Sequence, residues 1–172
     1  ETKNLDAVPA TIQLAGAEME LTSMMARETR LKQGIDEVNH EYDFILIDVA
    51  GRDSEIFREA LLVSDKIIVP TQASLLDLEV IPYIADKIKE AQEKNPLLKA
   101  SVVINKASAN PKNNEVAQAK EYLADYPIFK LVKTVIHDRK QFRDAIIESR
   151  SVSEMGSSKA KDELNEFLIE VL

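Results

Sequence analysis

The sequence predicts an α/β fold in which a parallel sheet is flanked by helices on both faces, giving three α/β/α layers. Short apolar runs rich in β-branched residues alternate with helical stretches along most of the 172-residue chain. A polar or turn-forming segment follows each apolar run directly. This alternation is typical of right-handed βαβ units, which build parallel sheets.

The first part of the chain predicts helix followed by a buried strand. Residues 10–40 carry apolar side chains at three- and four-residue spacing, which favours one or two helices with a break near Thr22 and Ser23. Residues 42–48 are a continuous apolar run that ends at Asp48. Such a run is typical of a strand buried on both faces of a parallel sheet.

The alternation then repeats three times. Pro82 should kink the long helix that contains it or delay its start, and Ser157 and Ser158 are the expected caps of the last helix. No repeat or flexible linker divides the chain, so we expect a single domain over residues 1–172. We expect strands at 66–70, 100–104 and 129–135, and helices at 54–63, 75–94, 113–124, 140–148 and 159–172.

The composition excludes several classes of function. There are no cysteines, so disulfides, thiolate metal sites and cysteine nucleophiles are excluded, and a reducing compartment such as the cytoplasm fits. No apolar run approaches the roughly 18 residues of a membrane span. The net charge of −8 disfavours broad attraction to nucleic acid but leaves room for a local basic patch.

Polar residues follow the predicted strands at the edge where parallel sheets bind ligands. Asp48 ends an apolar run in the Walker B pattern, in which a carboxylate orients a magnesium-bound water, and Gly51 allows close backbone approach to a phosphate. The alternative is that Asp48 only caps the turn that follows the strand.

Asn105 and Lys106 could contact a nucleotide base, because the asparagine amide matches the hydrogen-bonding edge of adenine and the aliphatic stem of the lysine can cover a ring. The alternative there is a loop asparagine that caps the next turn.

Four segments together resemble the ParA-type partition ATPases, in the deviant Walker group with MinD. They are 42–54, 62–74, 105–112 and 133–139, and residues 9–18 are similar to the segment that precedes the Walker B strand in chromosomal relatives. The resemblance covers essentially the whole chain in order. It implies a P-loop NTPase-like fold, of which residues 1–172 would be the C-terminal two thirds.

The resemblance also implies a function, plasmid or chromosome partitioning (DNA segregation). Such proteins bind ATP and Mg²⁺, form a nucleotide-sandwich dimer, bind DNA nonspecifically and hydrolyse ATP when a centromere-binding ParB-type protein stimulates them. A cytoplasmic, nucleoid-associated location and no membrane partner follow. In this chain Asp48 matches the catalytic, metal-binding aspartate and Gly51 the turn near the terminal phosphate. The adenine pocket would be lined by Asn105, Lys106, His137, Asp138 and Arg139.

One family motif is not found in these residues. The four glycines cannot build G-x-x-x-x-G-K-S/T, the P-loop that grips the triphosphate. Because Glu1 is not an initiator methionine, we expect the chain to be a fragment or a processed form, with the P-loop region ahead of it. The complete protein would then bind ATP/ADP and Mg²⁺. Residues 1–172 alone are predicted to be inactive, and without a P-loop they should not hold ATP tightly.

Charged residues suggest one further site. DNA contacts in this family tend to come from basic residues late in the chain, which here are Lys130, Lys133, Arg139, Lys140 and Arg143. The alternative is a set of exposed charges paired with Asp138, Asp144 and Glu148. The carboxylates of the last helix, Glu163 and Glu170 among them, are interpreted as a solvated face. The two histidines lack the spacing of metal ligands.

Three hypotheses remain for the function. The first is a partition ATPase, present here as part of its sequence. The second is a non-catalytic relative without a P-loop, which acts as a regulatory protein or binds DNA or a partner protein. The third is a flavodoxin-like binder of small molecules, which requires the collinear resemblance to be accidental.

Overall fold

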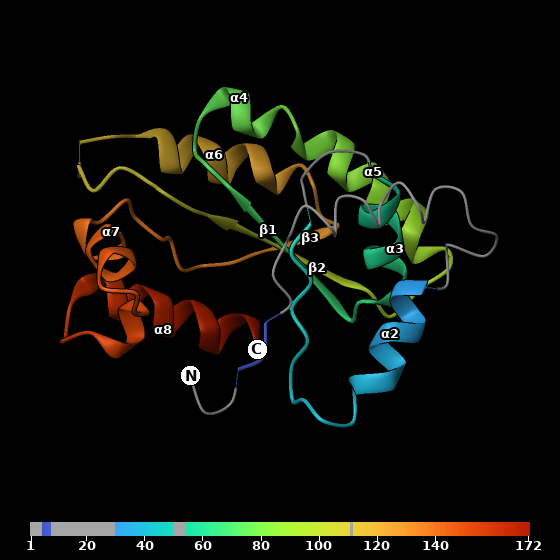
Figure 1. Cartoon of the computed structure of the whole chain (residues 1–172). Helices are drawn as coiled ribbons and strands as arrows, with labels where there is room; N and C mark the ends of the chain where they lie inside the picture. Colours follow the sequence, from blue (N-terminus) through green and yellow to red (C-terminus); the bar gives the residue numbers. More distant parts are fainter. Residues whose placement is uncertain (1–4, 8–29, 50–53, 111) are drawn as a thin grey trace. The chain divides into compact units, whose positions relative to one another are not determined.

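The computed structural model describes residues 5–7, 30–49, 54–110 and 112–172. The chain comprises two compact units, Glu1–Ala60 and Leu61–Leu172. The three strands found among these residues all belong to the second unit (Figure 1). That the whole chain is a single domain stays a prediction.

The elements alternate as the sequence predicts from residue 54 onward. The predicted helical region 10–40 contains α2, and its break near Thr22 and Ser23 lies outside the described residues. Ser158 is the N-cap of the last helix, because its hydroxyl accepts a hydrogen bond from the Lys161 backbone N–H at 3.3 Å. The elements are α2 (Arg30–Val38), α3 (Glu55–Val63), β1 (Lys66–Thr71), α4 (Leu75–Leu78), α5 (Ile81–Gln92), β2 (Lys99–Ile104), α6 (Glu115–Ala124), β3 (Phe129–Leu131), α7 (Lys140–Ile147), the 3₁₀ helix η2 (Val152–Glu154) and α8 (Lys159–Val171).

The sheet is parallel, with the strands in the order β1-β2-β3. In the first pair Val69 lies opposite Val102, and in the second Val102 lies opposite Leu131. The central strand β2 is buried along its length apart from its first residue, as an apolar run covered on both faces should be. The predicted parallel sheet is therefore confirmed.

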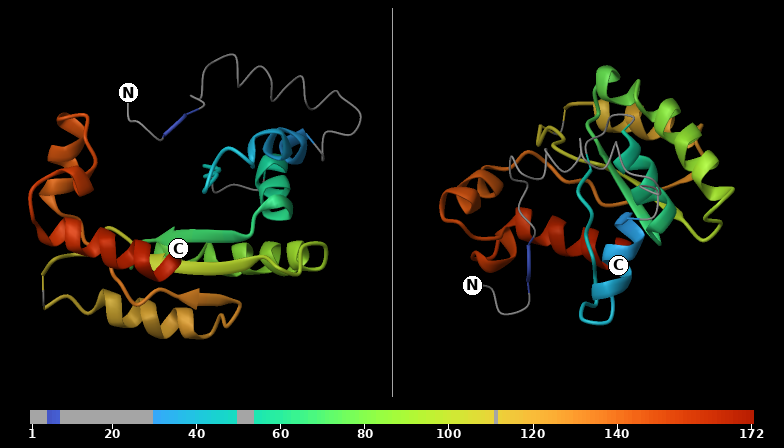
Figure 2. Two further views of the ribbon diagram at one scale, coloured as in Figure 1. Left: turned by 90° about the horizontal axis from the view of Figure 1, so that it is seen from below. Right: turned by 45° about the vertical axis from the view of Figure 1, so that its right-hand side comes forward.

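Helices cover both faces of the sheet. Val103 of β2 and Val132 pack with Val171 of α8, and the partly buried Ile68 and Phe167 join this cluster. Figures 1 and 2 show α5 and α6 on the side of the sheet opposite to α8. Each fully buried aliphatic side chain in such layers contributes about 1.5–3 kcal/mol. The three-layer arrangement predicted from the sequence is present in this unit.

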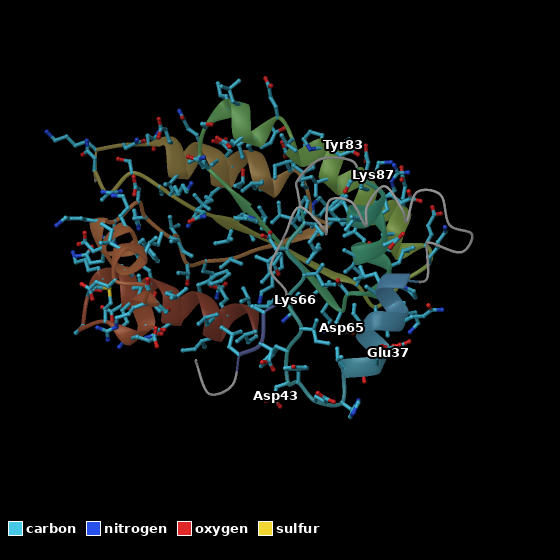
Figure 3. All side chains as sticks on the ribbon, viewed as in Figure 1. Glu37, Asp43, Asp65, Lys66, Tyr83 and Lys87 are labelled. Carbon is cyan, nitrogen blue, oxygen red and sulfur yellow. The ribbon has the colours of Figure 1, made fainter. Side chains whose placement is uncertain are left out.

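The predicted helix 75–94 is two helices. α4 ends at Leu78, and α5 begins at Ile81 with Pro82 in its first turn. Proline has no N–H to donate, which is tolerated only in the first turn, so the helix starts late. On α5 the Lys87 ammonium lies 5.8 Å from the centre of the Tyr83 ring, and Figure 3 labels both side chains.

The third strand is shorter than the predicted 129–135. β3 ends at Leu131, although the Val132 N–H still donates to the Val102 carbonyl at 2.9 Å. The next two N–H groups, of Lys133 and Thr134, donate to the Glu170 carboxylate at 2.7 and 3.1 Å. A side chain of α8 therefore replaces the sheet as the acceptor, and the chain leaves the ladder here.

The strand predicted at 42–48 is wrong. These residues form no strand in the described parts of the chain, and the Phe44 and Leu46 side chains are 65% and 89% exposed. The Tyr42 hydroxyl instead donates to Asp6 at 2.6 Å, and this hydrogen bond raises the tyrosine pKa. A strand buried on both faces needs neighbouring strands to take its N–H and C=O groups, and the described residues provide none for this segment.

Candidate functional site

The carboxyl edge of the sheet brings two separate segments together. The Asn105 N–H donates to the Thr71 carbonyl at 2.8 Å, so β2 pairs with β1 up to its last residues. Beyond β2, Ala107 and His137 form an isolated parallel bridge. The Ala107 N–H donates to the Ile136 carbonyl at 3.0 Å, and the Asp138 N–H donates to the Ala107 carbonyl at 2.9 Å. Two of the segments assigned to the base pocket in the sequence are thus hydrogen-bonded neighbours.

The first of these segments contains a left-handed residue. Lys106 has φ of 52°, a conformation that a non-glycine side chain adopts at a cost of roughly 1 kcal/mol or more. The Asn105 side-chain oxygen accepts a hydrogen bond from the Lys106 N–H at 2.9 Å and stabilises this turn. Among the described residues, no acceptor is bonded to the Asn105 amide nitrogen. Asn105 therefore caps the turn with its oxygen, and its two N–H donors remain for a ligand.

The second segment is held by a glutamate of α8. Glu163 Oε2 accepts from the His137 backbone N–H at 3.2 Å, and Oε1 lies 2.8 Å from His137 Nδ1. Oε1 also accepts from Arg139 Nε at 3.0 Å and from Nη2 at 2.5 Å. The Glu163 side chain is 14% exposed, and those of His137 and Arg139 are 27% and 20% exposed. One carboxylate thus fixes the backbone and two side chains of this segment.

The hydrogen bonds at Glu163 change its ionisation. Burial is the largest single influence and acts to raise the pKa of the carboxyl, but the hydrogen bonds from Arg139 and from the backbone and ring of His137 together outweigh it. The pKa of Glu163 is therefore lowered from its ordinary value. The hydrogen bond between Arg139 and Glu163 also raises the pKa of Arg139. Glu163 is an anion at neutral pH and acts as an acceptor only.

A second glutamate holds the start of the same segment. Glu170 accepts from the backbone N–H groups of Lys133 and Thr134 and from the Thr134 hydroxyl at 3.2 Å. Burial acts to raise the pKa of Glu170, but these hydrogen bonds act in the opposite direction and outweigh it, so the pKa is lowered from its ordinary value. Glu163 and Glu170 are seven residues apart on α8, which places both on one face of the helix.

These two glutamates correct the interpretation of α8 as carrying a solvated acidic face. The sequence did contain a signal for them. Ala160, Leu164, Phe167 and Val171 form the apolar stripe of α8 at three- and four-residue spacing, and all are buried or partly buried. Glu163 and Glu170 each directly precede a member of this stripe, so they lie at its border rather than on the opposite face.

Most of the basic residues late in the chain contact an acceptor within the protein. Arg143 Nη1 lies 2.5 Å from Asp138, Lys140 lies 3.5 Å from Asp144, and Lys130 donates to the Glu170 backbone carbonyl at 3.2 Å. Arg139 is engaged by Glu163, as described above. The Lys133 side chain is exposed. The pairings with Asp138, Asp144 and Glu148 that the sequence allowed as an alternative are therefore present, the last one between Arg150 and Glu148 at 3.6 Å.

The phosphate-site residues lie in the other unit. Asp48 is exposed and belongs to Glu1–Ala60, and Gly51 lies outside the described residues. Within the described ranges, no three His, Asp or Glu side chains are grouped closely enough to hold a metal ion. Among the helices described, none has the length and apolar character that crossing a membrane requires.

The chain matches known proteins over most of its length. The AAA domain family matches residues 1–104. The sporulation initiation inhibitor protein Soj of Bacillus subtilis is 34% identical over 138 residues, which covers 78% of this chain and 53% of the relative. The chromosome-partitioning ATPase Soj of Treponema pallidum is 35% identical over 89 residues, covering 52% of this chain and 35% of the relative. The chain therefore spans about half the length of the Bacillus relative.

A solved structure shares the fold. Cobyrinic acid a,c-diamide synthase from Mycobacterium smegmatis, determined with a bound ATP analog and magnesium, superposes with a TM-score of 0.67 at 23% identity. The match covers 81% of this chain and 61% of that one. At this identity the likeness shows a P-loop NTPase-like fold and nothing about the ligand of this chain. From the family match, the two relatives and the fold together, the chain belongs to the AAA domain family and, within it, to the ParA-type partition ATPases.

Proposed function

We propose that the full-length protein containing this chain is a DNA-partitioning ATPase, and that the carboxyl edge of the sheet holds the adenine of ATP. One observation carries the proposal. The Ala107–His137 bridge joins the two segments that the sequence assigned to the base. Open parallel sheets bind ligands at this edge, so the bridge and the family membership support the same site.

The residues at this edge fit a base. Asn105 offers its amide N–H groups, and the Lys106 stem offers aliphatic surface for a ring plane. His137 offers its second ring nitrogen, while the exposed Asp138 and the engaged Arg139 complete the proposed set. Asp48 would support the Mg²⁺ that accompanies the phosphates. The triphosphate itself requires backbone N–H donors of a P-loop, for which residues 1–172 contain no motif.

Substitution at Asn105 tests the base site. Asn105→Asp retains the oxygen that caps Lys106 and loses the amide donors, so the fold should persist while ATP binding weakens by roughly three- to tenfold. Asn114→Ala, at an exposed asparagine before α6, is the matched control and should bind ATP as the wild type does. The measurement is titration calorimetry of the full-length protein with Mg-ATP and Mg-GTP.

The ratio of ATP affinity to GTP affinity distinguishes two causes of weaker binding by Asn105→Asp. Repulsion between the new aspartate and the phosphates weakens ATP and GTP equally, whereas loss of a base contact lowers the preference for ATP. An Asn105→Asp protein that keeps the wild-type preference contradicts the base site. Absence of nucleotide binding by the wild type, together with DNA or partner binding, favours the non-catalytic alternative instead.

The partners are proposed from the family. The protein would dimerise around ATP, bind DNA nonspecifically and hydrolyse ATP faster with a centromere-binding ParB-type protein, in the cytoplasm at the nucleoid. Lys130, Lys133, Arg139, Lys140 and Arg143 are the proposed DNA contacts. Arg139 is the weakest of these, because Glu163 already neutralises its guanidinium.

DNA affinity as a function of salt tests this patch. Each phosphate contact removed should lower the slope of log affinity against log salt by about 1. Lys140→Ala with Arg143→Ala should therefore reduce affinity by more than a few-fold at low salt. Lys112→Ala, an exposed lysine outside the patch, is the control. Unchanged affinity and an unchanged salt slope in the double variant would contradict the assignment of Lys140 and Arg143 as DNA contacts.

A further inference from the structure

Glu163 is a carboxylate on α8 that contacts two residues of the proposed base site at once. It accepts hydrogen bonds from the His137 backbone N–H and from two nitrogens of Arg139, and its Oε1 lies 2.8 Å from His137 Nδ1. Its side chain is 14% exposed, so few water molecules compete for these contacts. The contact joins distant parts of the sequence, since Glu163 lies 26 positions after His137.

We propose that Glu163 is a positioning residue that sets the hydrogen-bonding character of His137 toward the base, an inference that rests on the adenine site proposed above. An anionic carboxylate can only accept a hydrogen bond. Neutral His137 must therefore carry its proton on Nδ1, where it donates to Glu163 Oε1 across 2.8 Å. The other ring nitrogen, Nε2, is then a hydrogen-bond acceptor.

An acceptor at Nε2 discriminates between purines. Adenine presents an exocyclic amino group, which is a donor, at the position where guanine presents the O6 acceptor. An imidazole whose Nε2 carries no proton accepts a hydrogen bond from the adenine amino group. The same Nε2 repels guanine O6, because both atoms then present lone pairs. Glu163 thus contributes to base specificity through His137, without contacting the nucleotide.

The arrangement of α8 supplies a control for purely structural effects. Glu170 holds the same loop at its other end, through Lys133 and Thr134, and has no contact with His137 among the described residues. Glu166 lies between the two glutamates on α8 and is exposed. Glu170→Gln should loosen the docking of α8 and Glu166→Gln should change neither docking nor base preference.

The experiment measures the ratio of ATP to GTP affinity in the full-length protein, with fluorescent ATP and GTP analogues. Glu163→Gln, whose amide can donate to the ring as well as accept, should lower this ratio by roughly three- to tenfold. Glu170→Gln and Glu166→Gln should keep it within about twofold of the wild type, the scatter expected for substitutions away from the base. A Glu163→Gln protein with the wild-type ratio overturns the inference, as does an equal loss in Glu170→Gln.

A second measurement is made on the wild type and uses a variant only to assign its signals. The ¹⁵N shifts of the His137 imidazole at a pH where the ring is neutral report which nitrogen carries the proton, with His137→Gln for assignment. Protonated Nδ1 and bare Nε2 support the inference, and the opposite tautomer refutes it. A wild type that binds no nucleotide, or binds ATP and GTP equally, contradicts the proposed base site, while the imidazole shifts still decide whether Glu163 sets the tautomer.

Discussion

The contact between Glu163 and Arg139 should stabilise the fold by an amount that its burial sets. The perturbation is a double-mutant cycle with Glu163→Ala, Arg139→Ala and the double variant. Charge-assisted hydrogen bonds contribute about 1.5–3 kcal/mol when shielded from water, and exposed ion pairs about 0.2–1 kcal/mol. With side chains 14% and 20% exposed, this pair lies nearer to the shielded case. We therefore expect a coupling energy of about 1–2 kcal/mol at pH 7.

The assay is urea denaturation followed by circular dichroism, with the free energy of unfolding obtained by linear extrapolation. The pair of Arg143 and Asp138 is the matched control, since its N–O distance is also 2.5 Å but its side chains are 60% and 59% exposed. Its coupling energy should be below about 1 kcal/mol. Distance alone would predict equal coupling for the two pairs, so equal values would show that burial does not set the strength.

The coupling should also depend on pH in a definite direction. Because the folded pKa of Glu163 is lowered from 4.5, the stabilisation is fully present above that value. It is lost as the pH falls through the lower folded pKa, where the carboxylate is protonated in both states. A coupling energy below about 0.3 kcal/mol at pH 7, or one that persists undiminished in strong acid, refutes the reasoning.

Further predictions concern the rest of the fold. Ile88→Ala, at a fully buried position of α5, should lower the free energy of unfolding by about 2–5 kcal/mol, whereas Ile146→Ala, 77% exposed on α7, should change it by less than about 0.5 kcal/mol; similar urea midpoints for the two would contradict the core assignment. Ser158→Ala should cost about 1 kcal/mol through loss of the α8 cap, with Ser158→Thr as the variant that retains it. Glu170→Ala should speed hydrogen exchange of the Lys133 amide while the β2 amides stay protected, and unchanged exchange would show that water replaces the carboxylate at no cost.

The sequence was a good guide where the local pattern decides the structure. Runs such as 100–104 became strands because their β-branched residues fill both faces of a sheet covered by helices. The late start of α5 follows from Pro82 alone, and the start of α8 follows from the cap at Ser158. The bridge between Ala107 and His137 also follows from the parallel topology, since the carboxyl ends of neighbouring strands share one edge.

The failures have a common physical cause, which is that partners distant in sequence decide the outcome. An apolar run at 42–48 reports hydrophobicity, but a strand also requires a neighbour for its backbone groups, and Leu46 is 89% exposed here. The end of β3 depends on Glu170, 37 residues beyond Lys133. The role of Glu163 at His137 is likewise invisible to periodicity, because a helix pattern gives the face of a residue and not the loop opposite it.

The proline in β1 has a consequence for how the described sheet could grow. The Asn105 N–H donates to Thr71, and in a parallel ladder alternate residues point to opposite edges, so Ile67, Val69 and Thr71 face β2. Lys66, Ile68 and Pro70 then face outward, and Pro70 has no N–H to offer. A strand added at this edge would find donors only in the first half of β1. Growth of the sheet would thus be anchored away from the end where Asn105 and His137 meet, which would leave that end open to a ligand.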